Sequence, residues 1–226
     1  VERIIKKLED FKNTKVEEQP PLPIENNVLK TFSIENEPVV ELVNNREREY
    51  IFADLPDIGY STDIDTVMAS SYQVKKQLQQ IVKIEQPITN TLLYKRILRI
   101  WNLTRVTTRL QVFIDSLLED AYKDPLSGDT IIYWENKEKA KECDFYRINS
   151  KRDILDIPIL EVMSAARYAI EQQISMPIED LKRLTSQLLG FSRKGNNLDM
   201  VTEQTIQLLI DKGIFSHANG MVSMNN

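Results

Sequence analysis

Basic side chains without acidic neighbours are the residues of this sequence best suited to binding chemistry, and they gather in one stretch. From Gln86 to Ile114 the chain carries five Lys or Arg residues and no Asp or Glu. Lysine and arginine contact phosphate oxygens and release the counterions bound there, so such a stretch is typical of a nucleic-acid contact. The five residues are Lys95, Arg96, Arg99, Arg105 and Arg109.

Two amphipathic helices are expected to position these side chains. Apolar residues recur at helical spacing in two runs: Leu93, Ile97, Ile100 and Trp101, then Val106, Leu110, Phe113, Ile114 and Leu117. The break between the helices falls at Asn102–Thr104, where Thr104 is expected to cap the second helix. The outer face of the second helix would carry Arg105, Thr108, Arg109 and Val112. This is the plan of a helix-turn-helix, whose second helix enters a DNA groove.

A hairpin is expected directly after this helix pair. Two apolar runs, Thr130–Trp134 and Phe145–Ile148, flank the charged segment Glu135–Glu142. A hairpin in this position is what the wing of a winged helix looks like.

The rest of the chain is expected to be mostly helical. Patterns typical of helices cover Ser71–Ile84, Ile159–Ile174, Pro177–Leu189 and Leu198–Lys212. A basic turn with Arg193 and Lys194 precedes the last of these and is expected to form a second, weaker phosphate contact. A short hairpin is expected at the end of the chain across Asn219-Gly220, the strongest two-residue turn signal.

The first 70 residues differ in character from the remainder. An amphipathic helix is expected at Val1–Val16, followed by a proline-containing linker at Glu17–Pro23. From Val16 to Ser70 there are twelve Asp or Glu residues against three Lys or Arg residues, a local charge of −9. This segment is expected to be a solvated arm, or alternatively an arm that screens the basic surface or binds a partner. The chain begins at Val1 rather than methionine, which indicates a fragment of a longer protein.

The second half of the sequence repeats the plan of the first. Pro87-Ile88 matches Pro177-Ile178 at a displacement of 90 residues, and Arg105 and Leu110 match Arg193 and Leu198 at a displacement of 88. The sequence therefore predicts a mainly α fold with small β hairpins, of the α+β class, built from tandem winged-helix-like units. The expected division is 1–70 for the arm, 71–149 for the first unit and 150–226 for the second. A single continuous helical domain is the alternative.

Composition argues against an enzyme. One histidine and one cysteine provide neither a zinc cluster nor a Cys-His pair, and no phosphate-binding P-loop occurs. We therefore expect no cofactor, no metal and no small-molecule substrate. No apolar run reaches the length of about 18 residues needed to cross a membrane. The net charge of −5 also argues against unspecific binding of nucleic acid along the whole chain.

Several short motifs in this sequence resemble those of one protein family. The motifs are Pro87-Ile88, Tyr94-Lys95-Arg96, Trp101, Arg105, Tyr133-Trp134, Tyr146-Arg147, Arg152-Asp153-Ile154, Asp156-Ile157-Pro158, Glu171-Gln172-Gln173-Ile174, Asp180-Leu181 and Gly190-Phe191-Ser192-Arg193. From Ser71 to Ile214 the chain resembles the domain of unknown function numbered 3320. That domain lies near the C-terminal end of large bacterial superfamily-one DNA helicases, often beside a very-short-patch-repair-like endonuclease domain. The resemblance implies a bacterial, cytoplasmic, DNA-associated parent protein and supplies no catalytic residues.

The sequence is compatible with two functions. The first is a non-catalytic DNA-binding accessory module that uses the basic residues of both units. The second is a protein-interaction or scaffold module that positions the helicase or nuclease domains without touching DNA. In the second case the acidic arm would cover Arg105 and Arg109, and these arginines would lie in internal ion pairs. The exposure of Arg99, Arg105 and Arg109 discriminates between the two.

Overall fold

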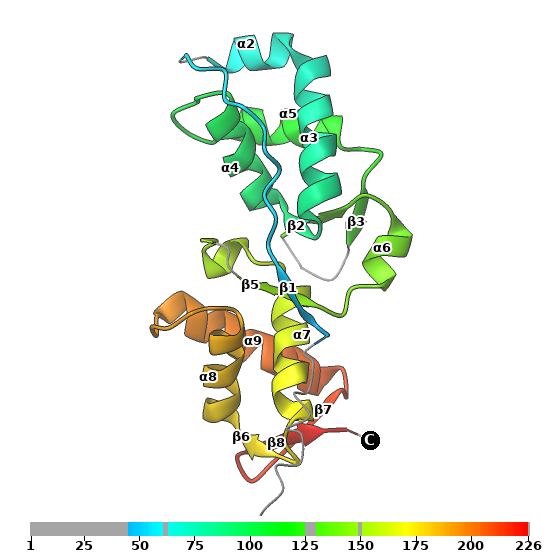
Figure 1. Ribbon diagram of the computed structural model, residues 1–226, viewed down its shortest axis with the longest axis vertical. Coiled ribbons are helices and arrows are strands. Elements are labelled where there is room, and N and C mark those ends of the chain that lie inside the picture. Colours follow the sequence, from blue (N-terminus) through cyan, green and yellow to red (C-terminus); the bar gives the residue numbers. More distant parts are fainter. Residues whose placement is uncertain (1–44, 61–62, 125–129, 149–150, 226) are drawn as a thin grey trace, which may run out of the picture. The chain divides into compact units, whose positions relative to one another are not determined.

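The computed structural model describes residues 45–60, 63–124, 130–148 and 151–225, which form a mainly helical α+β structure with small sheets (Figure 1). The first group of elements is α3 (Ser71–Glu85), β2 (Ile88–Thr89), α4 (Asn90–Ile100), α5 (Thr108–Leu117), β3 (Tyr122–Asp124) and β4 (Ile132–Trp134). The second group is α7 (Ile159–Glu171), β6 (Met176–Pro177), α8 (Ile178–Leu188), α9 (Asn196–Asp211), β7 (Phe215–Ala218) and β8 (Met221–Met224). The helix expected at Val1–Val16 and the linker at Glu17–Pro23 lie outside the described residues.

The remaining described elements precede, join or flank the two groups. They are β1 (Glu47–Glu49), α2 (Ile64–Ala69), α6 (Lys137–Lys141), β5 (Tyr146–Ile148) and the 3₁₀ turn η2 (Ile154–Asp156).

The two groups have the same order of elements at a constant displacement. The first helix begins at residue 71 or 159, the first strand at 88 or 176, the second helix at 90 or 178, and the third helix at 108 or 196. Each displacement is 88 residues. In each group the last strand lies between the other two and pairs antiparallel with both, in the orders β2-β4-β3 and β6-β8-β7.

This constant displacement corrects one part of the predicted repeat. Pro87 precedes β2, whereas Pro177 lies within β6 and directly before α8, so the match at 90 residues does not join equivalent positions. The match of Arg105 with Arg193 and of Leu110 with Leu198 agrees with the structural displacement. The displacement of 90 residues predicted from Pro87-Ile88 and Pro177-Ile178 is therefore wrong. A proline is compatible with several positions near the start of a helix, so it does not define the register of the repeat.

The helices predicted from apolar periodicity at Ser71–Ile84 and Ile159–Ile174 are confirmed as α3 and α7. In α3 the buried residues include Val74, Leu78, Ile81 and Val82. In α7 they include Val162, Ala166, Ala169 and Ile170. A stripe of this spacing leaves one helix face apolar, and burial of that face supplies most of the helix stability in water.

The predicted C-terminal hairpin is also confirmed. Strands β7 and β8 pair antiparallel across Asn219-Gly220. Asn219 has φ 52° and Gly220 has φ 76°. Two positive φ angles in a two-residue loop match the right-handed twist of the strands, and asparagine and glycine adopt them at low cost.

The predicted pairing of Thr130–Trp134 with Phe145–Ile148 is wrong. Strand β4 pairs with β3 instead, and β5 pairs in parallel with β1. The charged segment between β4 and β5 forms α6, whose first turn is capped by Asn136 accepting from the backbone N–H of Lys139. A hairpin therefore does follow α5, but it consists of β3 and β4, which begin eight residues earlier than the expected pair.

An extended segment, Glu49–Tyr60, runs beside the first group, and we refer to it as the strap (Figure 1). The backbone N–H of Tyr50 donates to the carbonyl oxygen of Ile148 over 3.0 Å, and that of Ile58 donates to Ile100 over 3.0 Å. The strap thus connects β5 with the C-terminal end of α4. No helical or strand period marks this segment in the sequence, since Tyr50 and Ala53 are buried while the neighbouring Ile51 and Phe52 are exposed.

Candidate nucleic-acid interface

The helix pair α4 and α5 carries most of the predicted site residues. Thr89 caps α4 by accepting from the backbone N–H of Leu92 over 3.2 Å. Thr107, not Thr104, caps α5 by accepting from the N–H of Leu110 over 3.2 Å. The predicted cap was wrong because α5 begins three residues later, where Leu110 and Ile114 are completely buried. Arg105 consequently lies in the loop before α5, and its predicted position on the helix face is also wrong.

Four of the predicted residues are exposed around the turn between α4 and α5. They are Arg99, near the end of α4, Arg105 in the loop, and Thr108 and Arg109 at the start of α5. The side chain of Arg109 is 58% exposed, and its guanidinium lies 2.8 Å from a carboxylate oxygen of Asp65 in α2. Asp65 is itself 72% exposed, so this ion pair contributes little to stability and can exchange for another partner.

The predicted residues Lys95 and Arg96 are engaged inside the molecule. The ammonium group of Lys95 lies 2.7 Å from both carboxylate oxygens of Asp156, although the lysine side chain remains 56% exposed. Arg96 is only 12% exposed; its Nε donates to Glu85 over 2.9 Å and its Nη2 donates to the carbonyl oxygen of Ala53. Arg96 therefore holds the strap to α3 and α4 and does not face solvent.

The position of Arg96 could have been found from its spacing. It stands three residues after Leu93 and four before Ile100, on the same stripe as the buried residues of α4. A basic residue on an apolar stripe needs a buried acidic partner, and Glu85 supplies it.

The one acidic residue on α4 or α5 is held at the packed side of the helices. Asp115 accepts a hydrogen bond from the hydroxyl of Tyr94 over 2.8 Å and from that of Tyr133 over 2.9 Å. Burial and the hydrogen bond to Asp115 raise the pKa of both tyrosine hydroxyls, which therefore stay protonated and donating. The carboxylate of Asp115 is thus occupied, and it leaves the charge of the exposed arginines without an acidic neighbour on the same helices.

The equivalent place in the second group has a different charge pattern. At a displacement of 88 residues, Tyr94 and Asp115 correspond to Lys182 and Glu203, whose charged groups lie 3.5 Å apart. Lys182 also contacts Asp199 over 2.7 Å and Glu179 over 3.4 Å. The hydrogen bond that Lys182 donates to Asp199 raises the pKa of Lys182, so the lysine is charged and fully engaged.

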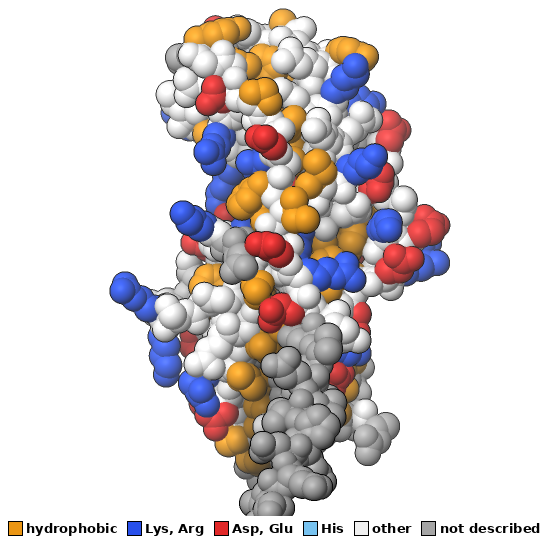
Figure 2. All heavy atoms as spheres, in the orientation of Figure 1, with side chains coloured by type: hydrophobic (Ala, Val, Ile, Leu, Met, Phe, Trp, Pro, Cys, Tyr) orange, Lys and Arg blue, Asp and Glu red, His pale blue; other side chains and the backbone are white. Residues whose placement is uncertain are grey.

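The predicted residues Arg193 and Lys194 are exposed in the loop before α9. They line a cleft of about 560 Å³ between α8 and α9, which Glu179 and Asp199 also line. One exposed acidic residue of α8 and one of α9 therefore line the same cleft as the basic loop of the second group. In Figure 2, Lys and Arg side chains are interspersed with Asp and Glu across the visible face, so any basic surface is local.

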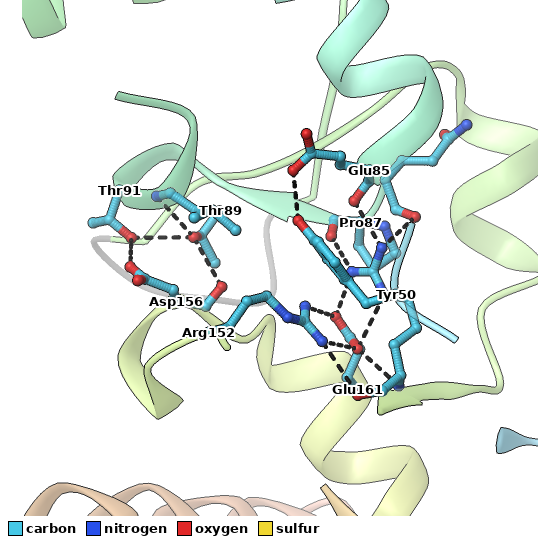
Figure 3. Close-up of polar contacts among 11 residues, drawn as sticks. Tyr50, Glu85, Pro87, Thr89, Thr91, Arg152, Asp156 and Glu161 are labelled. Carbon is cyan, nitrogen blue, oxygen red and sulfur yellow. Dashed lines mark hydrogen bonds and ion pairs between the residues drawn. The ribbon is translucent and has the colours of Figure 1, made fainter. Parts of the chain in front are cut away.

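A buried cluster of charged residues that the sequence did not reveal lies where β5, α7 and the end of α3 meet (Figure 3). Glu161, fully buried on α7, accepts from Arg147 over 2.5 Å and from Arg152 over 2.8 Å. Arg147 also donates to the carbonyl oxygens of Glu85, Gln86 and Pro87. Because Glu85 is the last residue of α3, its carbonyl is one that the helix end leaves without an intrahelical partner, and Arg147 satisfies it.

The side chains of this cluster are also covered by an aromatic ring. The guanidinium of Arg152 lies 4.1 Å from the ring centroid of Tyr50, and that of Arg147 lies 4.7 Å from it. The hydroxyl of Tyr50 donates to Glu85 over 2.5 Å. The strap, the first group and the second group are thus joined by one set of buried polar contacts.

Metal binding and thiol chemistry can be assessed for the described residues. They contain no group of three or more His, Cys, Asp or Glu residues arranged to hold an ion. Burial raises the pKa of the Cys143 thiol to about 12, so this cysteine is protonated and unreactive at neutral pH. Among the helices of the described ranges, none has the length and apolarity that crossing a membrane requires.

Comparison with known proteins gives one match. Neither the curated proteins nor the solved structures compared with the chain matched it. Residues 69–112, which include α3, β2, α4 and the first half of α5, match the model of a family described as a protein of unknown function, DUF3320. The match thus covers the helix pair that carries the exposed arginines, and this segment of the chain is similar to DUF3320.

Proposed function

We propose that this chain is a non-catalytic DNA-binding module made of two winged-helix-like units in tandem. The order of helix, strand, two helices and a hairpin, with the last strand in the middle of the sheet, supports this assignment for both groups. In that plan α5 is the helix that meets DNA in the first unit, and α9 is its counterpart in the second. We propose further that the parent protein is a larger bacterial, cytoplasmic, helicase-related protein, as the motifs shared with the domain of unknown function numbered 3320 imply; residues 69–112 match the model of that family.

One observation carries the proposal. Arg99, Arg105 and Arg109 are exposed around the start of α5, while the single acid of α4 and α5 is bound by two tyrosine hydroxyls. Arginines in this position can contact phosphates on both sides of a groove, and Thr108 adds a hydroxyl donor at the N-terminus of α5.

The second unit is the weaker contact in this proposal. Arg193 and Lys194 are exposed, but Asp199 and Glu203 lie on the helix that corresponds to α5, with side chains 62% and 63% exposed. Acids at these positions repel phosphates, so we assign the main contact to the first unit.

The proposal is tested by fluorescence anisotropy of labelled DNA titrated with the chain at low ionic strength. Binding that fails when the exposed arginines of the first unit are reversed in charge supports it. An absence of binding to single-stranded, duplex and forked DNA would refute it.

A scaffold function is the second candidate, and a specific observation favours it. Three of the five basic residues between Gln86 and Ile114 already have acidic partners inside the chain: Lys95, Arg96 and Arg109. A module that contacts only other domains of its parent would need no free arginines. In that case removal of the Asp65 carboxylate, the exposed partner of Arg109, would neither create nor strengthen DNA binding.

Neutralising Asp65 is therefore expected to strengthen DNA binding. Asp65→Asn releases Arg109 from its partner at 2.8 Å and removes a negative charge beside the proposed contact. Because an exposed ion pair is worth roughly 0.2–1 kcal/mol, we expect the dissociation constant to fall by about 1.4- to 5-fold. The measurement is DNA anisotropy at a single low salt concentration.

Asp120→Asn is the matched control for this substitution. Asp120 is also exposed and also pairs with one basic residue, Lys75, at 3.2 Å. It changes the net charge equally but leaves Arg109 paired. Equal gains in the two variants would show that only the total charge matters, and the local role of Asp65 would then be wrong.

A further inference from the structure

The strap ends at an exposed aromatic residue, Tyr60, near the end of α4 that carries the exposed Arg99. Ile58 is bonded to Ile100 at the end of α4, directly after Arg99, and Asp65 is bonded to Arg109 at the start of α5. Tyr60 lies between these two fixed points of the chain. Two residues span at most about 7 Å, so Tyr60 lies close to the end of α4.

Tyr60 differs from the other exposed aromatic residues of the strap and of the described part of the first group, because its ring has no aromatic or cationic partner among the described residues. Its side chain is 63% exposed, compared with 46% for Phe52 and 73% for Tyr72. The ring of Phe52 is contacted by Arg96 and Tyr50, and Lys76 lies 4.6 Å from the centroid of Tyr72. Among the described residues, no ring and no cation contacts the ring of Tyr60. Its face is therefore free to receive a planar partner.

We propose that Tyr60 stacks on an unpaired base and that the module prefers single-stranded DNA to blunt duplex. The inference rests on the proposed DNA contact, since Arg99, Arg105 and Arg109 would hold the phosphates while Tyr60 holds the base. An aromatic ring beside a basic surface is how proteins bind single strands without sequence preference, because every base has a π face. A base inside a duplex is already stacked and paired, so it cannot stack on the ring of Tyr60.

The backbone of the strap turns directly before Tyr60. Gly59 has φ 72°, a left-handed conformation that favours glycine and turns the chain between Ile58 and Tyr60. The backbone N–H of Gly59 donates to the carboxylate of Asp57 over 2.9 Å, which fixes the turn. The positive φ angle and this hydrogen bond together define the turn that leads to Tyr60.

The test compares four probes and three variants by fluorescence anisotropy. The probes are an oligothymidylate, an abasic strand of the same length, a blunt duplex and a fork. The variants are Tyr60→Ala, Tyr60→Phe and, as an equally exposed tyrosine elsewhere, Tyr72→Ala. We expect Tyr60→Ala to weaken binding of oligothymidylate by about 5- to 150-fold, the range that loss of one base stack produces. Binding of the abasic strand and the duplex should stay unchanged, and Tyr60→Phe and Tyr72→Ala should behave as the unaltered chain.

Three results would overturn the inference. If Tyr60→Ala binds oligothymidylate as tightly as the unaltered chain while arginine reversal abolishes binding, the DNA contact stands and the stacking is wrong. If Tyr60→Ala weakens all four probes equally, the tyrosine acts on the fold or on the phosphates. If the unaltered chain binds none of the probes, both the stacking and the proposed function fail.

Discussion

Replacing Glu161 with glutamine is expected to lower the free energy of unfolding by about 3–5 kcal/mol, the cost of leaving buried charges without their partner. Glu161 is fully buried and holds two arginines, Arg147 and Arg152, whose side chains are 5% and 1% exposed. Glutamine keeps the size of the side chain but removes the negative charge. The measurement is urea denaturation followed by far-ultraviolet circular dichroism, with the midpoint and slope compared between variants.

Glu179→Gln provides the matched control for this prediction. Glu179 is also on a helix and also pairs with a basic residue, Lys182, but its side chain is 76% exposed. Its replacement should change stability by no more than about 1 kcal/mol. A loss below about 1 kcal/mol for Glu161→Gln as well would show that the buried cluster is not a major source of stability.

The same cluster predicts how stability depends on pH. Burial alone would raise the pKa of the Glu161 carboxyl, but Arg147 and Arg152 outweigh it and lower the pKa. A group whose pKa is lowered on folding contributes its stability fully above its unfolded value of about 4.3 and loses it as the pH falls through the folded value. The unaltered chain should therefore lose stability on acidification over that range, and the Glu161→Gln variant should show a smaller loss.

Reversing the charge of both Arg105 and Arg109 is the second large effect that we expect. Arg105→Glu/Arg109→Glu removes two proposed phosphate contacts and adds two repulsive charges at the start of α5. We expect DNA affinity to fall on the order of 100-fold, since each lost contact also removes the release of about one counterion. Both side chains are exposed, so folding should be unaffected, which circular dichroism checks.

Arg183→Glu/Lys212→Glu is the matched control for the double reversal. It changes the net charge by the same amount, and both residues are exposed on the second unit, at α8 and at the end of α9. We expect only a small loss of DNA affinity. Equal losses in the two double variants would assign binding to the total charge and not to the turn between α4 and α5.

Helical periodicity and turn chemistry were sufficient to predict most of the helices. The residues of α3 and α7 repeat their apolar side chains at the helical period, and Asn219-Gly220 can form only a narrow set of turns. Local sequence carries both signals, because each depends on residues within a few positions of one another.

Contacts between distant segments could not be predicted in this way. Strand β1 pairs with β5 in the register Glu47 to Tyr146, and nothing in the acidic composition of β1 indicates a partner so far along the chain. The sequence alone predicts exposed side chains for Arg147, Arg152 and Glu161, since charged residues are seldom buried unless they are paired. The same distinction applies to the candidate site. The exposed arginines could be predicted from local pattern. The burial of Arg96 could not, because it depends on Glu85 and on the strap.

The most direct test of the DNA contact is the salt dependence of DNA affinity for the unaltered chain and for Arg105→Glu/Arg109→Glu. A plot of the logarithm of affinity against that of salt concentration has a slope of about −0.9 per duplex phosphate neutralised. We expect a steep slope for the unaltered chain and a slope smaller by about two in magnitude for the double variant. Affinity that is independent of salt, or the same slope in both proteins, would contradict a phosphate contact by α5 and favour the scaffold function.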